Sequence, residues 1–164
     1  MSRTSQSVAL AAVVAVLGVF AAAKLQYSGE PPLKLPVAEC DPDLWKHVYD
    51  PGRLRVIEAC TAVEGRVVSV HSAADGDMHI GLDPEHKSVL NLVNVMHARR
   101  KLVVEVVCDH APPDKGAVPC CAGFTSSITA PRVGDLIRVT GAYVTDRDNG
   151  WNEIHPVTRI EVLH

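Results

Sequence analysis

The chain has 164 residues, of which 47% are hydrophobic and 21% are charged, and its formal net charge at pH 7 is −3. This length allows one domain with a single core beyond any targeting segment. The mildly acidic balance disfavours nucleic acid as a partner, because binding to a phosphate backbone needs concentrated positive charge. Local basic runs such as Arg99-Arg100-Lys101 are more typical of a solvated loop.

The N-terminal segment carries a targeting signal. Residues 8–23 form an uncharged apolar run between Arg3 and Lys24. The run is longer than most signal-peptide cores but shorter than the roughly 20 residues that comfortably cross a bilayer. Ala21 and Ala23 fit a signal-peptidase site, whereas Lys24 would suit the membrane interface of an uncleaved anchor. We expect a signal-anchor or a signal peptide here, with the anchor favoured.

An export segment at residues 1–24 determines where the remainder works. The membrane becomes a partner through residues 8–23, and the domain lies on the extracytoplasmic side of the cell membrane as part of a single-pass protein, or is secreted after cleavage. Residues 25–39 are polar and broken by prolines, which predicts a linker. The domain itself is then expected over residues 40–164.

The cysteines fit an oxidising compartment. There are 5 of them. Cys40 and Cys60 flank the entry into the domain, and we predict a disulfide between them. A second disulfide is predicted between Cys108 and Cys121, because the chain returns locally after a proline-rich excursion and the turn after Cys121 could direct its sulfur inward. Cys120 is then the free thiol. A metal–thiolate site is the alternative, but the chain lacks the Cys/His spacing typical of zinc sites.

Two short helical stretches are predicted. Asp41 fits an N-cap and Pro42 the first helical position of a turn over residues 44–48. The same pairing of aspartate and proline precedes a second stretch within residues 89–96. Helix is therefore a minor component of the expected domain.

The rest of the domain has the alternation and composition of β-strands. In the second strand Met78, Ile80 and Leu82 alternate with Asp77 and His79, which places the apolar side chains in the core and the polar ones outside. Strands are predicted over residues 63–71, 77–83, 102–108, 135–145 and 151–163, the last interrupted at Pro156. These elements predict a mainly β domain, a small five-stranded barrel with one or two short helices.

The order of these elements and two motifs resemble the oligonucleotide/oligosaccharide-binding (OB) fold. Val63, Gly65 and Val67 form a Val-x-Gly-x-Val motif in the first strand. Residues 133–141 carry a Gly-Asp-x-x-x-Val-x-Gly pattern in the fourth. The resemblance implies a five-stranded OB-like barrel.

A narrower resemblance covers roughly residues 40–160. The segments 75–80, 102–108 and 150–157 are similar to those of a family of small exported or membrane-anchored OB-like proteins without an assigned activity. This resemblance implies the fold and leaves the ligand open.

The Asp75-Gly76-Asp77 segment resembles the hairpin of staphylococcal-type thermonucleases, which are exported OB-fold enzymes. These enzymes hold calcium with aspartates and cleave phosphodiesters using arginine and glutamate. The resemblance implies a divalent metal held by Asp75, Asp77 and His79. The arginine-bearing segment expected on the next strand is missing from this chain. The alternative interpretation is that Asp75 and Gly76 only form a turn.

A second candidate site mixes carboxylates and imidazoles. Alternation places Asp77 and His79 on one face of their strand and Glu153 and His155 on one face of the last strand, with Glu105 on a third strand. If these strands are neighbours, the residues form a patch that could bind zinc or act as general acid and base. The alternative is a hydrogen-bonded or solvated surface.

A third candidate is an aromatic pair. Trp151 follows an Asp-Asn-Gly turn, and we expect Tyr143 opposite it across the hairpin. Aromatic side chains on an OB face can stack bases or sugars. A cross-strand aromatic pair also stabilises a hairpin by itself, so the pair alone does not define a site.

From the sequence we expect an extracytoplasmic, membrane-anchored binding module that is not an enzyme. The candidate ligand-binding residues are Asp77, His79, Tyr143, Trp151, Glu153 and His155. The ligand is a protein, a glycan, a metal ion or another small molecule, and the cofactor is left open with a divalent metal ion as the candidate. One alternative is a metal-dependent, nuclease-like hydrolase with Asp77, His79, Glu153 and His155 as catalytic residues. The other is a structural cell-envelope protein.

Overall fold

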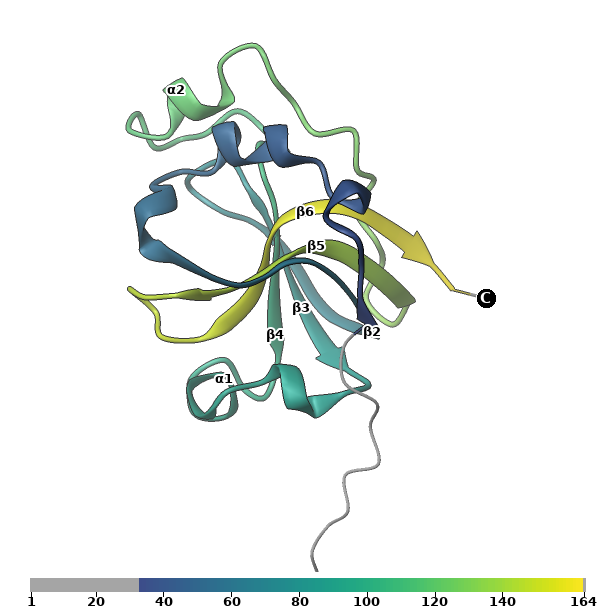
Figure 1. Cartoon of the computed structure of the whole chain (residues 1–164). Coiled ribbons are helices and arrows are strands. Elements are labelled where there is room, and N and C mark those ends of the chain that lie inside the picture. Colours follow the sequence, from purple (N-terminus) through teal and green to yellow (C-terminus); the bar gives the residue numbers. More distant parts are fainter. Residues whose placement is uncertain (1–32, 164) are drawn as a thin grey trace, which may run out of the picture.

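A computed structural model of the chain describes residues 33–163 (Figure 1). The described part is mainly β, with a few short helices. The export segment predicted at residues 1–24 and the beginning of the predicted linker lie outside the described residues. Within residues 33–163, no helix has the length and apolar character needed to cross a membrane.

Five strands close into a ring. In ring order, β2 pairs with β3, β3 with β4, β4 with β6, β6 with β5, and β5 again with β2. All of these pairs are antiparallel except β4 with β6, which is parallel. A short strand, β1, adds to β2. The strands are β1 (Leu33–Lys34), β2 (Leu54–Ser72), β3 (Met78–Pro84), β4 (Leu102–Val106), β5 (Leu136–Asp146) and β6 (Asn152–Val162).

The strands differ in extent from those predicted. β2 begins at Leu54 rather than at residue 63, and register shifts between Val56 and Thr61 break the period-two alternation on which the prediction relied. The predicted interruption at Pro156 is wrong, because β6 runs through this residue. The strand accommodates it with register shifts in its pairing to β5, on both sides of Gly141.

The inner side of the ring is an apolar core. Met78, Ile80 and Leu82 of β3 are buried there, as their alternation predicted. Val104 of β4 and Ile154 of β6 are fully buried against them. Burying this apolar surface is the main favourable contribution to folding, so the core fixes the register of each strand and therefore which residues point outward.

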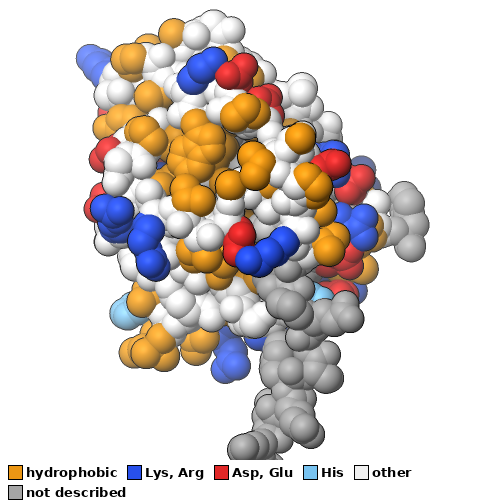
Figure 2. All heavy atoms as spheres, viewed as in Figure 1, with side chains coloured by type: hydrophobic (Ala, Val, Ile, Leu, Met, Phe, Trp, Pro, Cys, Tyr) orange, Lys and Arg blue, Asp and Glu red, His pale blue; other side chains and the backbone are white. Residues whose placement is uncertain are grey.

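Short helices and loops cover part of the outer side. A second apolar cluster forms here, in which Leu44 and Trp45 pack against Val48, Leu54 and Val144. Figure 2 shows apolar side chains gathered on this face, over η2. Residues 33–39, part of the predicted linker, include β1 and η1. The helices are η1 (Val37–Glu39), η2 (Pro42–His47), η3 (Pro51–Arg53), η4 (Lys87–Val89), α1 (Leu92–Met96) and α2 (Val118–Cys121).

Two disulfides link these covering segments covalently to the rest of the domain. Cys40 is bonded to Cys60 and Cys108 to Cys121, the two pairs predicted from the sequence, and Cys120 is the free cysteine. Asp41 caps η2 by accepting a hydrogen bond from the Asp43 amide, with Pro42 at the start of the helix, which is the arrangement predicted for this turn. Two disulfides indicate an oxidising, extracytoplasmic environment.

The close packing of β5 against β6 at Gly141 gives a test of the ring. A Cβ added at Gly141 on β5 would lie 2.5 Å from the Pro156 carbonyl oxygen and 2.7 Å from Ile154 Cγ2. We expect Gly141→Ala to lower the free energy of unfolding by about 1–3 kcal/mol, because the strands must move apart. Urea unfolding of the full chain measures this change. Gly52→Ala is the control, since its Cβ would meet no atom closer than 3.4 Å; equal stability of both variants would contradict the prediction.

Candidate functional site

Polar side chains form a row across the outer side of four neighbouring strands. Cross-strand pairing places His71 of β2 beside His79 of β3, and His79 beside Glu105 of β4. The parallel pairing of β4 with β6 brings His155 next to Glu105. Burial increases along the row: the side chain of His79 is 25% exposed, that of Glu105 3% and that of His155 0%. The row therefore runs from the surface into a covered polar interior.

His155 is the centre of this interior. Its Nδ1 lies 2.8 Å from Glu105 Oε2 and 3.2 Å from Glu153 Oε1. Burial alone would lower the pKa of His155, but the charge of Glu105 and the hydrogen bonds to Glu105 and Glu153 outweigh burial and raise the pKa to about 10. The His155 imidazole is therefore charged at neutral pH.

Glu105 is the main partner of this charge. Burial opposes ionisation of its carboxylate, but His155, followed by His79 and Arg53, outweighs burial and lowers the pKa of Glu105 to about 2. His79 Nε2 lies 3.4 Å from Glu105 Oε1. Glu105 thus connects the buried histidine to the partly exposed one.

Asp77 completes the interior from the loop before β3. Its Oδ1 accepts a hydrogen bond of 2.8 Å from the backbone amide of Cys108, and its Oδ2 lies 3.7 Å from His155 Nε2. Burial raises the pKa of Asp77 to about 7, because the positive charge of His155 and the Cys108 hydrogen bond only partly compensate for lost hydration. The sequence placed Asp77 on an exposed face; its alternation was correct, but covering segments bury the residue to 1% exposure.

Arg53 is the second cation of the interior. From the end of η3, its Nη1 lies 2.5 Å from Asp146 Oδ2 and 3.8 Å from Glu153 Oε1, and its Nη2 lies 3.5 Å from Glu105 Oε2. Asp146 in turn accepts hydrogen bonds from the backbone amides of Asp148 and Asn149 in the β5–β6 turn. We call the following six residues the polar cluster: Arg53, Asp77, Glu105, Asp146, Glu153 and His155.

A pocket of about 270 Å³ lies beside the polar cluster. It is bounded by β2, β3, β4, the loop after α1 and the β5–β6 turn. We call it the basic pocket, because its lining includes His71, His79, His97, Arg99 and Lys101, together with Trp151. His79 contacts Glu105, and the Trp151 indole donates a 3.0 Å hydrogen bond to Glu153. These two side chains connect the pocket to the polar cluster.

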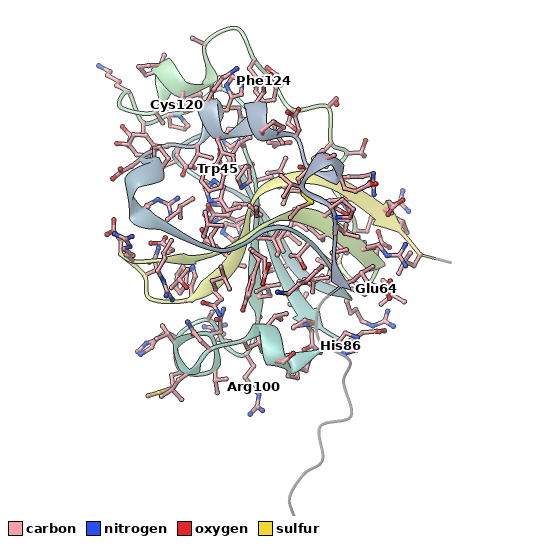
Figure 3. The ribbon with its side chains drawn as sticks, in the orientation of Figure 1. Trp45, Glu64, His86, Arg100, Cys120 and Phe124 are labelled. Carbon is pink, nitrogen blue, oxygen red and sulfur yellow. A yellow bond between two sulfur atoms is a disulfide. The ribbon has the colours of Figure 1, made fainter. Side chains whose placement is uncertain are left out.

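The basic character extends beyond this pocket. Arg99, Arg100 and Lys101 line an adjoining hollow of about 440 Å³. Figure 3 places Arg100 at the α1 end of the molecule, opposite the end that carries Cys120. Arg99 and Arg100 have φ values of 54° and 63°, a left-handed conformation that is unfavourable for non-glycine residues and is often found at functional sites.

The structure brings together most of the residues singled out in the sequence. Asp77, His79, Glu105, Glu153 and His155 converge because β4 lies between β3 and β6. Tyr143 does not belong to this group: it pairs with Ile154, is buried in the inner core and donates its hydroxyl to the Val89 carbonyl. The predicted aromatic pair with Trp151 is therefore wrong, since Trp151 lines the pocket on the outer side.

Asp75 serves the turn. Its carboxylate accepts a hydrogen bond from the Asp77 amide, which matches the turn interpretation of the Asp75-Gly76 pair.

Arg53 and Asp146 were missed by sequence reasoning. Asp146 ends a strand before a turn, a common place for aspartate, and Arg53 is distant from the other members in sequence, so neither carried a local signal.

The arrangement offers two kinds of chemistry. Asp77, Glu105 and His155 each present one ligand atom within 4.8 Å of the others, a spacing compatible with one metal ion. A carboxyl with a pKa near 7 could also exchange protons at neutral pH. The three ligand residues are buried, however, and the members of the row that line the pocket are His71 and His79.

The raised pKa of Asp77 predicts a pH dependence of stability. A carboxyl whose pKa is higher in the folded than in the unfolded state stabilises the fold below the unfolded value of about 4, and this contribution is lost as the pH rises through about 7. Relative to Asp77→Asn, which keeps the acceptor for Cys108, the wild type should lose up to about 4 kcal/mol between pH 4 and 7. Urea unfolding with EDTA present measures this difference. Parallel pH profiles would contradict the prediction, and the exposed Asp148→Asn is the control.

The position of Arg53 predicts a large stability effect. Arg53→Gln leaves Glu105, Asp146 and Glu153 without their shared cation, and we expect a loss of about 3–5 kcal/mol of unfolding free energy. Arg147→Gln, at an exposed arginine, serves as the matched control in the same denaturant titration. A loss below about 1 kcal/mol for Arg53→Gln would mean that the carboxylates do not depend on this cation.

Comparison with known proteins adds no candidate function. No protein-family model matches the sequence, and no curated protein is significantly similar to it. The functional inference therefore depends on the geometry of the polar cluster and the basic pocket.

Proposed function

We propose that this chain is an extracytoplasmic OB-type binding module whose basic pocket binds a compact anionic ligand with a phosphate or carboxylate group. The observation that carries the proposal is the placement of two cations, Arg99 and Lys101, together with three imidazoles that can form hydrogen bonds, around one pocket in a chain whose net charge is negative. A local concentration of positive charge on an acidic protein attracts anions selectively.

The strand order supports the OB assignment. If the ring strands β2 to β6 are renumbered one to five in chain order, neighbours around the ring follow the order one, two, three, five, four and back to one. Strands three and five are the parallel pair. OB folds are five-stranded barrels that bind ligands on the face of strands two and three and with the loop between strands four and five. Here β3 and β4 are strands two and three, and Trp151 comes from the turn between β5 and β6. The basic pocket shares the face of strands two and three and the loop between strands four and five with OB ligand sites, and it adds His97, Arg99 and Lys101 from the segment between strands two and three.

The pocket chemistry supports a small anion. Its volume of about 270 Å³ lies just below the range of about 300–1,000 Å³ typical of small-molecule sites. Lys101 is held near Ser69, with 3.4 Å between Nζ and Oγ, and Trp151 is fixed by its bond to Glu153. A cation and an aromatic ring in fixed positions suit a ligand that combines an anionic group with a ring, such as a uronic acid or a phosphorylated sugar.

The two disulfides support export, and the apolar residues 8–23 support attachment to a membrane. In this proposal the domain presents the basic pocket on the extracytoplasmic side. A hydrolase would need a catalytic group in contact with the ligand, and a structural envelope protein would show no small ligand at all. Both alternatives are separated from the proposal by the experiment below.

Trp151 provides a direct readout of the pocket. The chain has 2 tryptophans, and Trp45 lies in η2, away from the α1 end (Figure 3). In full-length protein carrying Trp45→Phe, titration with glucuronate, glucose 6-phosphate or inorganic phosphate should change the fluorescence of Trp151 in a saturable way. Uncharged glucose should not produce this change.

Variants connect the binding to the pocket. Lys101→Gln should weaken binding on the order of tenfold, because it removes one charged hydrogen bond. Arg159→Gln, at an exposed arginine outside the pocket, should leave the affinity unchanged. Saturable binding that survives Lys101→Gln, or no binding of any anion up to millimolar concentration, would refute the proposal. Release of phosphate from the sugar phosphate would instead favour the hydrolase.

A further inference from the structure

We propose that Asp77, Glu105 and His155 bind one divalent transition-metal ion in the covered interior next to the basic pocket. This inference is independent of the proposed function, because it concerns residues that do not line the pocket. The three residues come from the loop before β3, from β4 and from β6, which are neighbours in the ring. Their ligand atoms lie within 4.8 Å of one another.

Two buried atoms without hydrogen-bond partners lie where the ion would bind. Asp77 Oδ2 and His155 Nε2 are buried and have no hydrogen-bond partner among the described residues. These two atoms face each other at 3.7 Å. An ion about 2.1 Å from each of them fits this separation, since zinc binds imidazole nitrogen and carboxylate oxygen at about that distance. Buried polar atoms without partners are rare in folded proteins, and a bound cation would satisfy both atoms.

The surroundings orient the ligands in the way metal sites require. The Nδ1 of His155 lies 3.2 Å from Glu153 Oε1, its hydrogen-bond partner, and Nε2 faces Asp77 Oδ2 at 3.7 Å. Metal-bound histidines commonly use the second ring nitrogen in this way, with a carboxylate fixing the ring. The Cys108 amide likewise holds Asp77 through Oδ1 and leaves Oδ2 available. Glu105 offers the third ligand atom, within 4.8 Å of the atoms from Asp77 and His155.

The charge of the polar cluster favours a divalent ion. Its four carboxylates, Asp77, Glu105, Asp146 and Glu153, face two cationic side chains, Arg53 and His155. With every group ionised, the described cluster carries two negative charges more than positive ones. A divalent ion bound to neutral His155 would reduce this imbalance in a region where uncompensated charge is costly.

The ligand set selects the type of metal. One imidazole and two carboxylates suit zinc or manganese, whereas calcium prefers six to eight oxygen ligands. His79, whose Nε2 lies 3.4 Å from Glu105, is the route by which an ion could enter from the pocket. The site therefore shares Asp77 with the predicted metal site of Asp75, Asp77 and His79, but it uses neither Asp75 nor His79.

Metal titration of the full-length chain tests the site. After treatment with EDTA, calorimetry with Zn²⁺ and Mn²⁺ and elemental analysis after dialysis should show about one ion per chain. Asp77→Asn and His155→Gln should weaken binding on the order of 100-fold. Asp75→Asn and His71→Gln are matched controls outside the three ligands, and both should bind as the wild type does. No bound ion, or binding lost in His71→Gln but kept in Asp77→Asn, overturns the proposal.

A measurement on the wild type alone covers the case in which the variants do not fold. X-ray absorption of the zinc-loaded chain should show one imidazole and otherwise oxygen ligands, without sulfur. Sulfur would place the ion at Cys120, which lies at the opposite end of the molecule from α1 (Figure 3), and two or more imidazoles would place it in the basic pocket. Either result overturns the assignment to Asp77, Glu105 and His155.

Discussion

The arrangement of this domain depends on the compensation of charge around His155. Glu105, Glu153 and Asp77 surround an imidazole with no exposure to solvent, and Arg53 supplies the second positive charge. Buried ionic groups contribute little to stability by themselves, because the loss of hydration offsets their attraction. What they impose is geometry: each carboxylate must remain near a cation, and this requirement fixes how the covering segments lie on the ring.

The parallel pairing of β4 with β6 is what brings the polar groups together. Residues far apart in sequence become neighbours on one outer face, with Glu105 between His79 and His155. The inner face of the same strands is apolar and holds the register. One side of the sheet thus provides stability, while the other presents an array whose exposure decreases from His71 to His155. An anion in the pocket and a cation in the interior would lie at the two ends of one row of side chains.

Much of this organisation could be predicted from the sequence. Alternation in β3 identified its core residues, the turn residues identified the hairpins, and the spacing of the cysteines gave both disulfides. The sequence also identified Asp77, His79, Glu105, Glu153 and His155 as candidate site residues, because carboxylates and imidazoles can bind metals or transfer protons. Their burial could not be predicted, because alternation reports which face a residue occupies and not what covers that face. Arg53 illustrates the difficulty: it joins the cluster from the end of η3, a short helix whose position depends on the finished ring.

One covalent feature connects the compartment to this geometry. The amide that holds Asp77 belongs to Cys108, which is bonded to Cys121 and has a φ of 52°. A chain that still has reduced thiols lacks the cross-link that fixes this backbone segment. Oxidation of the Cys108–Cys121 pair therefore adds a covalent constraint on the backbone that presents this amide to Asp77.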